Sequence, residues 1–299
     1  MKTSPDTADG KRFAFGKNWT RFLATIDESR IQHAMDDIAA MLEVQSLAGQ
    51  RFLDIGCGSG LSSLAARRLG ATVHSFDFDP DCVRCASELR QRYFPDDPHW
   101  SIEQGSALDR DYVESLGSFD VVYSWGVLHH TGRMWEAIDN ACLPAGSRGQ
   151  LFLSIYNDQG PISELWGIVK KAYCHAPTLL RPLIVLPIAL TIESLSFVRA
   201  CVLGRPLAWL WQRFRGQAAR GMNLWYDWVD WIGGYPFEVA KPEEVFDFCR
   251  QRGFALQRLE TVGGRNGCNC LVFQRTSQTE RAGLDDSARR GADSTRAAA

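Results

Sequence analysis

The sequence has almost no net charge, no secretory leader and few metal-like spacings. Its 33 Lys and Arg residues balance 35 Asp and Glu residues to a net charge of −2, so the chain as a whole has no bias toward nucleic acid. Residues 1–11 are polar and cannot form the hydrophobic segment of a signal peptide. Nine cysteines without such a leader are typical of reduced thiols. We therefore expect a cytoplasmic protein.

Metal ligands at recognisable spacings are scarce as well. Cys82 and Cys85 are separated by two residues, but they fall on a predicted helix, and Cys268 and Cys270 lie far away in the chain. We interpret these cysteines as small buried side chains and expect no metal. With 299 residues, 45% of them hydrophobic, the chain can bury one sizeable core with an elaboration, or two small domains.

The strongest local pattern is a short apolar strand that ends in three glycines. Phe52, Leu53 and Ile55 predict a buried parallel strand. The glycines at 56, 58 and 60 allow a sharp turn and let a ligand lie against the backbone. Residues 61–69 then carry apolar side chains at helical spacing, with a glycine stop at 70. Strand, turn and helix predict the first half of a nucleotide-binding βαβ unit.

Two details distinguish this turn from a dinucleotide fingerprint. The glycines alternate, one residue too close for G-x-G-x-x-G, which excludes a NAD-dependent oxidoreductase. Asp54 also precedes the first glycine, where a carboxylate would repel a pyrophosphate but suits an amino group or a sulfonium. The stretch resembles motif I of the class I S-adenosylmethionine (SAM) methyltransferases. This resemblance implies that the glycine loop packs against the amino acid portion of SAM.

The second predicted strand, residues 72–76, ends at a carboxylate that suits a ribose. Asp77 follows the glycine loop by about 20 residues, where a Rossmann-type unit holds both ribose hydroxyls. Asp79 lies two residues further on and precedes Pro80, so it fits better as a helix N-cap. We therefore assign the ribose to Asp77.

The third predicted strand, residues 100–104, departs from the family pattern at its end. Many class I members place an aspartate after the following glycine to hold the adenine amino group, and this chain has Ser106 there. Adenine recognition is left to backbone groups of Ser106 and Ala107, to the Ser106 hydroxyl, or to Asp109.

The fourth predicted strand, residues 119–124, leads into residues 125–131, which resemble the family's fourth motif. In the family, the carboxyl end of this strand carries the transferring methyl group. His129 and His130 follow, and imidazole is suited to general-base chemistry near neutral pH. We take His130 as the candidate base, with packing or pocket shaping as the alternative for either ring. The resemblance implies ten cofactor-binding residues in all: Asp54, Gly56, Gly58, Gly60, Asp77, Phe78, Ser106, Ala107, Ser124 and Trp125.

The remaining pattern completes a class I fold. We expect an α/β architecture: a Rossmann-like, seven-stranded, mostly parallel sheet with an antiparallel C-terminal hairpin and a helical cap insertion. The methyltransferase core comprises residues 46–158 and 238–275. An N-terminal helical extension (1–45) either closes over the cofactor, with Lys17, Asn18 and Trp19 as candidates, or packs on the sheet edge. Residues 276–299 form a disordered tail.

The insertion, residues 159–237, is apolar and basic. From residue 159 to 225 it has eight Lys or Arg and two acidic residues, a net charge of +6 that leaves −8 for the rest. Residues 182–192 are uncharged, but Glu193 and Arg199 interrupt the run short of the roughly 20 residues that a membrane span needs. Three interpretations remain open: a cap that builds the acceptor pocket, a membrane-interface segment that delivers a lipophilic acceptor, or a homodimer contact.

An aromatic run closes the insertion and supplies further acceptor-side candidates. Asp227 and Asp230 share a helix face among tryptophans, where burial would raise their pKa as a base requires. Tyr226 and Tyr235 complete this set.

The predicted function is methyl transfer from SAM to a small organic acceptor, hydrophobic or anionic, with O-methylation favoured. One alternative is a SAM-binding regulatory or partner protein without transferase activity. A second is an RNA methyltransferase, which the basic insertion permits, although no RNA-binding module supports it. The sequence also lacks Asn/Asp-Pro-Pro-aromatic after the fourth strand, which resembles the signature of enzymes that methylate planar nitrogens in nucleic acids. We therefore expect no nucleic-acid partner.

Overall fold

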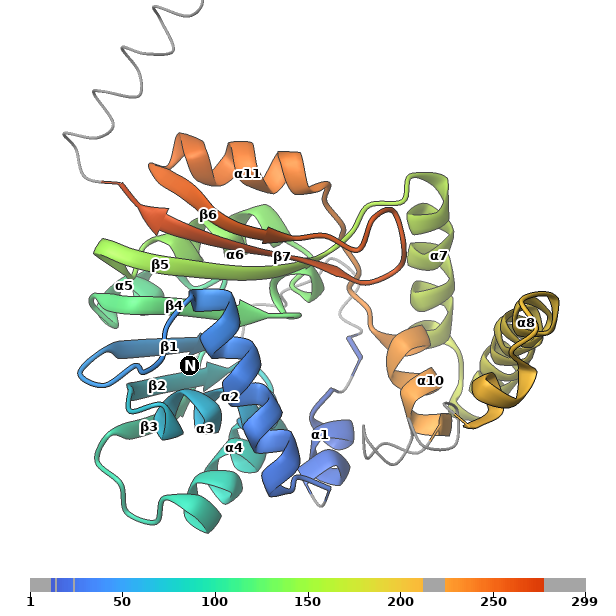
Figure 1. Ribbon diagram of the computed structural model, residues 1–299, viewed down its shortest axis with the longest axis horizontal. Coiled ribbons are helices and arrows are strands. Elements are labelled where there is room, and N and C mark those ends of the chain that lie inside the picture. Colours follow the sequence, from blue (N-terminus) through green and yellow to red (C-terminus); the bar gives the residue numbers. More distant parts are fainter. Residues whose placement is uncertain (1–11, 14, 24, 212–223, 277–299) are drawn as a thin grey trace, which may run out of the picture.

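One seven-stranded sheet forms the centre of the computed structural model (Figure 1). The structure describes residues 12–13, 15–23, 25–211 and 224–276, with the backbone alone at residues 17, 18, 21, 224–227 and 230. The strands lie in the order β3-β2-β1-β4-β5-β7-β6, and β7 runs antiparallel to its neighbours. They are β1 (Arg51–Ile55), β2 (Thr72–Asp77), β3 (Trp100–Gln104), β4 (Phe119–Trp125), β5 (Ala145–Tyr156), β6 (Phe254–Glu260) and β7 (Cys268–Arg275). The predicted fold class is confirmed.

Both faces of the sheet are covered by helices, so the central strands β1, β4 and β5 are mostly buried, whereas the edge strands β3 and β6 are partly exposed. Neighbouring residues such as Phe52 and Leu53 belong to opposite hydrophobic clusters, because successive side chains of a strand point to opposite faces. One face is covered by α5 (Arg110–Ser115), α6 (Met134–Cys142) and α11 (Pro242–Gln251). The other is covered by α2 (Glu28–Leu42), α3 (Leu61–Arg68) and α4 (Pro80–Tyr93).

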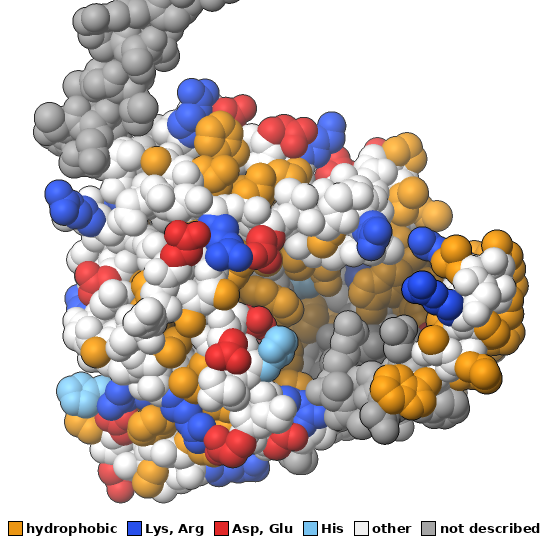
Figure 2. Space-filling model, viewed as in Figure 1, with side chains coloured by type: hydrophobic (Ala, Val, Ile, Leu, Met, Phe, Trp, Pro, Cys, Tyr) orange, Lys and Arg blue, Asp and Glu red, His pale blue; other side chains and the backbone are white. Residues whose placement is uncertain are grey.

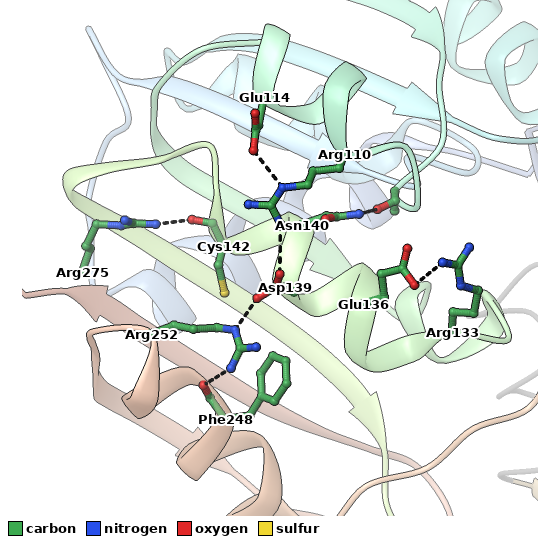
Figure 3. Close-up of polar contacts among 11 residues, drawn as sticks. Arg110, Glu114, Arg133, Glu136, Asp139, Asn140, Cys142, Phe248, Arg252 and Arg275 are labelled. Atoms are coloured by element: carbon green, nitrogen blue, oxygen red, sulfur yellow. Dashed lines mark hydrogen bonds and ion pairs between the residues drawn. The ribbon is translucent and has the colours of Figure 1, made fainter.

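Ion pairs and hydrogen bonds tie α6 to its neighbours (Figure 3). Asp139 on α6 pairs with Arg110 of α5 at 3.1 Å and with Arg252, just after α11, at 2.5 Å. Beside it, Asn140 reaches the loop after β3, where its side-chain amide donates to the Ala107 carbonyl at 2.9 Å. The helix layer therefore holds a loop that belongs to the predicted cofactor site.

The insertion forms helices to one side of the sheet (Figure 1). They are α7 (Pro161–His175), a 3₁₀ turn (Thr178–Leu180), α8 (Arg181–Val202), a further helix at residues 206–211, and α10 (Leu224–Gly233). A separate small cluster joins α7, α8 and α10 through Tyr173, Cys174, Val185 and Ile232. We expected Glu193 and Arg199 to interrupt the apolar run that begins at residue 182, but α8 continues through both residues. The stretch Thr178–Val202 contains an 18-residue window with a mean hydropathy of 1.8 and would suffice to cross a membrane by length and composition.

The N-terminal segment runs from the insertion to the glycine loop. The Phe13 amide donates to the Tyr235 carbonyl at 2.9 Å, and helix α1 (Phe15–Leu23) packs on α4. Trp19 lies against Gly58, close enough that a Cβ at that glycine would stand 3.2 Å from its ring. Of the other two extension candidates, Lys17 and Asn18, the structure describes the backbone alone. This segment therefore borders the predicted cofactor site.

Candidate cofactor and acceptor site

The site lies at the carboxyl ends of β1 and β4, where the strand order reverses. In open α/β sheets this switch point is where ligands bind. The turn after β1 requires its glycines: Gly56 has φ +76°, and a Cβ there would come within 2.3 Å of Val127 Cγ1. Gly60 has φ +82° and lies against the backbone of α4, 2.8 Å from Ala86 Cα. The turn is thus pressed between β4 and α4.

Asp77 holds this turn with its carboxylate. Its Oδ2 accepts from the Gly58 amide and its Oδ1 from the Asp79 amide, each at 2.9 Å. Burial raises the pKa of Asp77 from its usual 3.8 to about 6, against the lowering effect of these two hydrogen bonds. Asp79 caps α4 by accepting from the Asp81 amide, as predicted, and also accepts from the Gly16 amide. The helix-cap role predicted for Asp79 is therefore confirmed, and the ribose role of Asp77 stays a prediction.

Asp54 lies buried beneath the turn, and its carboxylate is hydrogen-bonded within the protein. Only 2% exposed, its Oδ2 accepts from the Ser63 hydroxyl of α3 at 2.5 Å. Ser63 in turn shares a hydrogen bond with Ser75 of β2. Burial raises the pKa of Asp54 to about 7. In this arrangement Asp54 joins β1 to α3 and supports the glycine loop from behind, a role that we had not predicted.

The two predicted aromatic residues are exposed at the ends of β2 and β4, the strands on either side of β1. Phe78 follows β2 and is 43% exposed, and Trp125 ends β4 and is 54% exposed. Arg12 spans from the Phe78 ring, 4.9 Å from its centroid, to the His130 carbonyl, to which it donates at 2.8 Å. Ser124 is buried and donates to the Ile55 carbonyl, so its hydroxyl serves the sheet. The aromatic side chains therefore flank the mouth of the site.

The loop after β3 is organised by hydrogen bonds within the protein. The Ser106 hydroxyl accepts from the Leu108 amide at 3.2 Å, and Asp109 caps α5 by accepting from the Tyr112 amide. The Ala107 carbonyl accepts from Asn140. Each of the three alternatives for adenine thus has a hydrogen-bond partner within the protein, and the choice among them stays a prediction. Asn140 was missed, since nothing in the sequence pairs α6 with this loop.

His130 is a poor fit to the general-base role that we gave it. The ring is 9% exposed, and its Nδ1 donates to the Pro236 carbonyl at 2.6 Å. Burial lowers its pKa to about 3, with the charges of Lys170 and Arg12 adding to that effect. Phe15 packs on the same ring at 4.8 Å. His130 thus connects the β4 loop, the N-terminal segment and the end of the insertion, and it binds a proton only weakly.

His129 is fully buried next to it, and its pKa is also lowered by burial. Its Nδ1 accepts from the Tyr156 amide at 3.3 Å. Of the other acceptor-side candidates, Tyr235 packs in the small cluster of the insertion. Tyr226, Asp227 and Asp230 fall on α10, but their side chains lie outside the described residues.

The insertion contributes a buried cation that we did not predict. Lys170 of α7 is 2% exposed and its ammonium donates to the Trp231 carbonyl of α10. It faces the rings of Phe237, Trp231 and Tyr156, with the first at 4.9 Å. These residues line a small cavity of about 20 Å³ beside the end of β5. Within the described ranges, no group of His, Cys, Asp or Glu side chains could hold a metal ion.

Known proteins match this architecture. A family model described as a methyltransferase domain matches residues 53–143, from β1 to the end of α6. The chain contains a class I methyltransferase domain. The SAH-bound magnesium protoporphyrin IX methyltransferase from Synechocystis PCC 6803 has the same fold, with a TM-score of 0.50 and 17% identity over 87% of this chain and 95% of that one.

Two curated relatives match parts of the methyltransferase domain. A ubiquinone biosynthesis O-methyltransferase from Xanthomonas oryzae is 38% identical over 128 residues, 41% of this chain and 48% of that protein. A tRNA U34 carboxymethyltransferase from Pseudomonas savastanoi is 42% identical over 86 residues, 28% of this chain and 25% of that protein. The chain thus spans half or less of the length of these relatives.

The methyltransferase domain fits SAM, the cofactor of its class. The glycine turn presents a backbone without Cβ atoms, and Asp77 carries a carboxylate at the adjacent strand end. Phe78 and Trp125 present exposed aromatic surface beside it. The observed residues therefore suit an adenosine that carries an amino acid chain.

Proposed function

We propose that the protein transfers the methyl group of SAM to an oxygen of a small acidic or hydrophobic organic acceptor. The observation that carries the proposal is the turn after β1 with Asp77 at the adjacent strand end, inside a chain segment that matches the methyltransferase domain model. SAM supplies a methyl group on a positively charged sulfur, which is already activated for displacement.

The side chains around the mouth have the tasks of alignment and water exclusion. In-line displacement needs mainly a correctly placed nucleophile that has lost its water. Apolar surface is supplied by Trp125, Phe15 and Phe78. Arg12 holds the N-terminal segment beside the opening through its contacts with the His130 carbonyl and the Phe78 ring. Such a site would favour a flat or lipophilic acceptor over a hydrated one.

The chemistry of His130 narrows the acceptor class. A base is needed only if the acceptor must lose a proton, and an imidazole with a pKa of about 3 removes protons poorly. The proposal therefore favours acceptor oxygens that are already ionised near neutral pH, such as a carboxylic acid or a phenol whose pKa is lowered by electron-withdrawing substituents. The +6 charge of residues 159–225 would attract such anions.

The first test is calorimetric titration with SAM and S-adenosylhomocysteine. Asp77→Ala should weaken binding about 100-fold, because two charge-assisted hydrogen bonds are worth about 3 kcal/mol together. The matched control is Asp79→Ala, which removes the neighbouring carboxylate and a helix cap and should change affinity only a few-fold. A folded wild-type protein that binds neither compound would refute the proposal.

Labelled SAM then separates the remaining functions. Label transfer to phenols or carboxylic acids supports the proposal. Binding of SAM without transfer to any acceptor would identify a regulatory SAM-binding protein. Transfer to tRNA that falls steeply with added salt would identify an RNA methyltransferase.

A further inference from the structure

The helix α8 exposes apolar side chains over most of its surface. Only Val185 and Ala200 of α8 are buried, and only 11% of the apolar 18-residue window within Thr178–Val202 is buried in the structure. Leu183, Leu186 and Leu190 are spaced by three and four residues, so they share one face of the helix. Leu183 and Leu190 are 67% and 64% exposed. A folded protein rarely leaves so large an apolar surface in water unless something covers it.

The chain beyond α8 extends this surface. Residues 206–211 fold back on α8, where the Trp209 indole donates to the Ser196 hydroxyl at 2.8 Å and meets the Phe197 ring edge to face. Leu203 and Leu207, at the turn, are 62% and 78% exposed. Figure 2 shows hydrophobic side chains gathered at the right edge of the molecule, where α8 lies, with Lys or Arg side chains beside them.

The charges around this surface are almost all positive. Arg181 begins α8, while Arg199 and Arg205 stand exposed near its end. Residues 159–225 have a net charge of +6, whereas the remaining chain has −8. An apolar surface edged by arginines is complementary to a bilayer with anionic headgroups, because leucines enter the acyl region while guanidinium groups stay with phosphates.

The neighbours of α8 oppose a simple crossing of the membrane. A single crossing would leave α7 and α10 on opposite sides of the bilayer. In the structure these helices pack together: the ring centroids of Trp166 and Trp231 lie 4.2 Å apart, and the Lys170 ammonium donates to the Trp231 carbonyl. The chain must therefore leave the bilayer on the side where it enters.

We propose that α8, with residues 203–211, embeds in one leaflet of an anionic lipid bilayer and holds the methyltransferase domain at the membrane surface. This inference is independent of the proposed reaction, since it concerns a surface outside the cofactor site. It also gives a reason for the separate small cluster, which joins α8 to α7 and α10 and so to the domain.

The test is flotation of the full chain with vesicles of phosphatidylcholine alone, or of phosphatidylcholine and phosphatidylglycerol in equal parts. The wild type should float with the anionic vesicles and more weakly with the neutral ones. Leu183→Gln/Leu190→Gln should lower the partition coefficient at least about tenfold, because two leucines no longer enter the bilayer. Arg199→Gln and Arg205→Gln should each lower it about fivefold on anionic vesicles alone.

The matched control is Ser194→Gln, which changes an exposed polar position of the same helix and should float like the wild type. SAM titration of each variant, expected to be unchanged, shows that the domain remains folded. Equal flotation of the leucine variant and the wild type would overturn the proposal, as would a folded wild type that floats with neither vesicle. A dimer that dissociates in the leucine variant, without vesicle binding, would instead make α8 an interface between copies.

Discussion

The cofactor side and the insertion differ in how their surface groups are satisfied. At the carboxyl ends of β1 and β2, backbone amides and carboxylates satisfy one another within a few ångströms, as in the contacts of Asp77 with Gly58 and Asp79. Along α8, apolar side chains stand in water with little to contact. The polar groups of the first region thus have partners within the chain, whereas the exposed apolar surface of the second implies a partner outside it. Substitutions should accordingly disturb ligand binding and stability at the first region, and association at the second.

The largest effect is expected at the glycine turn. Gly56→Ala adds a Cβ that would lie 2.3 Å from Val127 Cγ1, on a backbone with φ +76°. Steric and backbone strain together should lower the free energy of unfolding by about 3–4 kcal/mol and abolish SAM binding. Gly263→Ala is the control, because its φ is +59° but no atom lies within 4 Å, so it should lose only about 1 kcal/mol. Equal losses in urea unfolding would contradict the packed turn.

A tenfold change in SAM affinity is expected when the pH is lowered. Because the pKa of Asp77 is about 6, roughly one-tenth of this carboxyl is ionised at pH 5. SAM affinity should therefore fall about tenfold between pH 7.5 and pH 5, measured by calorimetry. Asp77→Asn should bind weakly and with little dependence on pH. An equally steep decline in that variant would assign the effect to another group.

The same carboxyl should affect stability in the opposite direction. Its pKa is higher in the folded protein than the usual 3.8, so the folded state binds the proton more tightly. The stability that this contributes is fully present below about pH 4 and is lost as pH rises through about 6. Chemical unfolding of the ligand-free protein, compared with Asp77→Asn, measures it.

A smaller effect is expected where α6 supports the loop after β3. Asn140→Ala removes the donor to the Ala107 carbonyl (Figure 3). The looser loop should weaken SAM binding about fivefold, equivalent to one hydrogen bond. Asp139→Ala, which breaks the adjacent ion pairs, should leave affinity within about twofold, since partly exposed pairs contribute little. Equal affinity of Asn140→Ala and the wild type would separate this loop from the site.

The smallest effect is expected at His130. His130→Asn keeps a donor for the Pro236 carbonyl and should change kcat less than about twofold toward a phenolic acceptor, with the same pH profile. His130→Ala loses that donor and the ring contacts, so it should be less stable by about 2 kcal/mol. A pH profile that loses an ionisation in His130→Asn would restore the base that we first assigned.

The parallel half of the sheet was largely predictable from the amino-acid sequence. The third strand has the predicted boundaries, and α4 begins at Pro80 after its Asp79 cap. Each of these depends on residues within a few positions of one another: an apolar run, a capping carboxylate, a proline, a glycine. The assignment of the ribose to Asp77 depends on equally local features, a strand end and the glycine turn that precedes it, and it stays a prediction.

The predictions that changed concern residues whose partners are remote in sequence. Asp54 was taken as facing the cofactor, yet its partner is Ser63 on α3. His130 was taken as a base, yet Pro236, 106 residues away, accepts from its ring. Glu193 was taken as ending an apolar run, yet α8 continues through it because one charge costs an exposed helix little. Burial and hydrogen-bond partners set such roles, and both depend on packing.

The sequence by itself determined the α/β class and the glycine turn after the first strand, because local spacing and strand periodicity dictate them. Only the tertiary structure decided which side chains are buried, and thus that Asp54 supports the turn and that His130 binds protons weakly. It also brought Arg12, Asn140 and Lys170 to their partners from distant segments. The same packing left α8 exposed, since its neighbours α7 and α10 cover one face of it and no more.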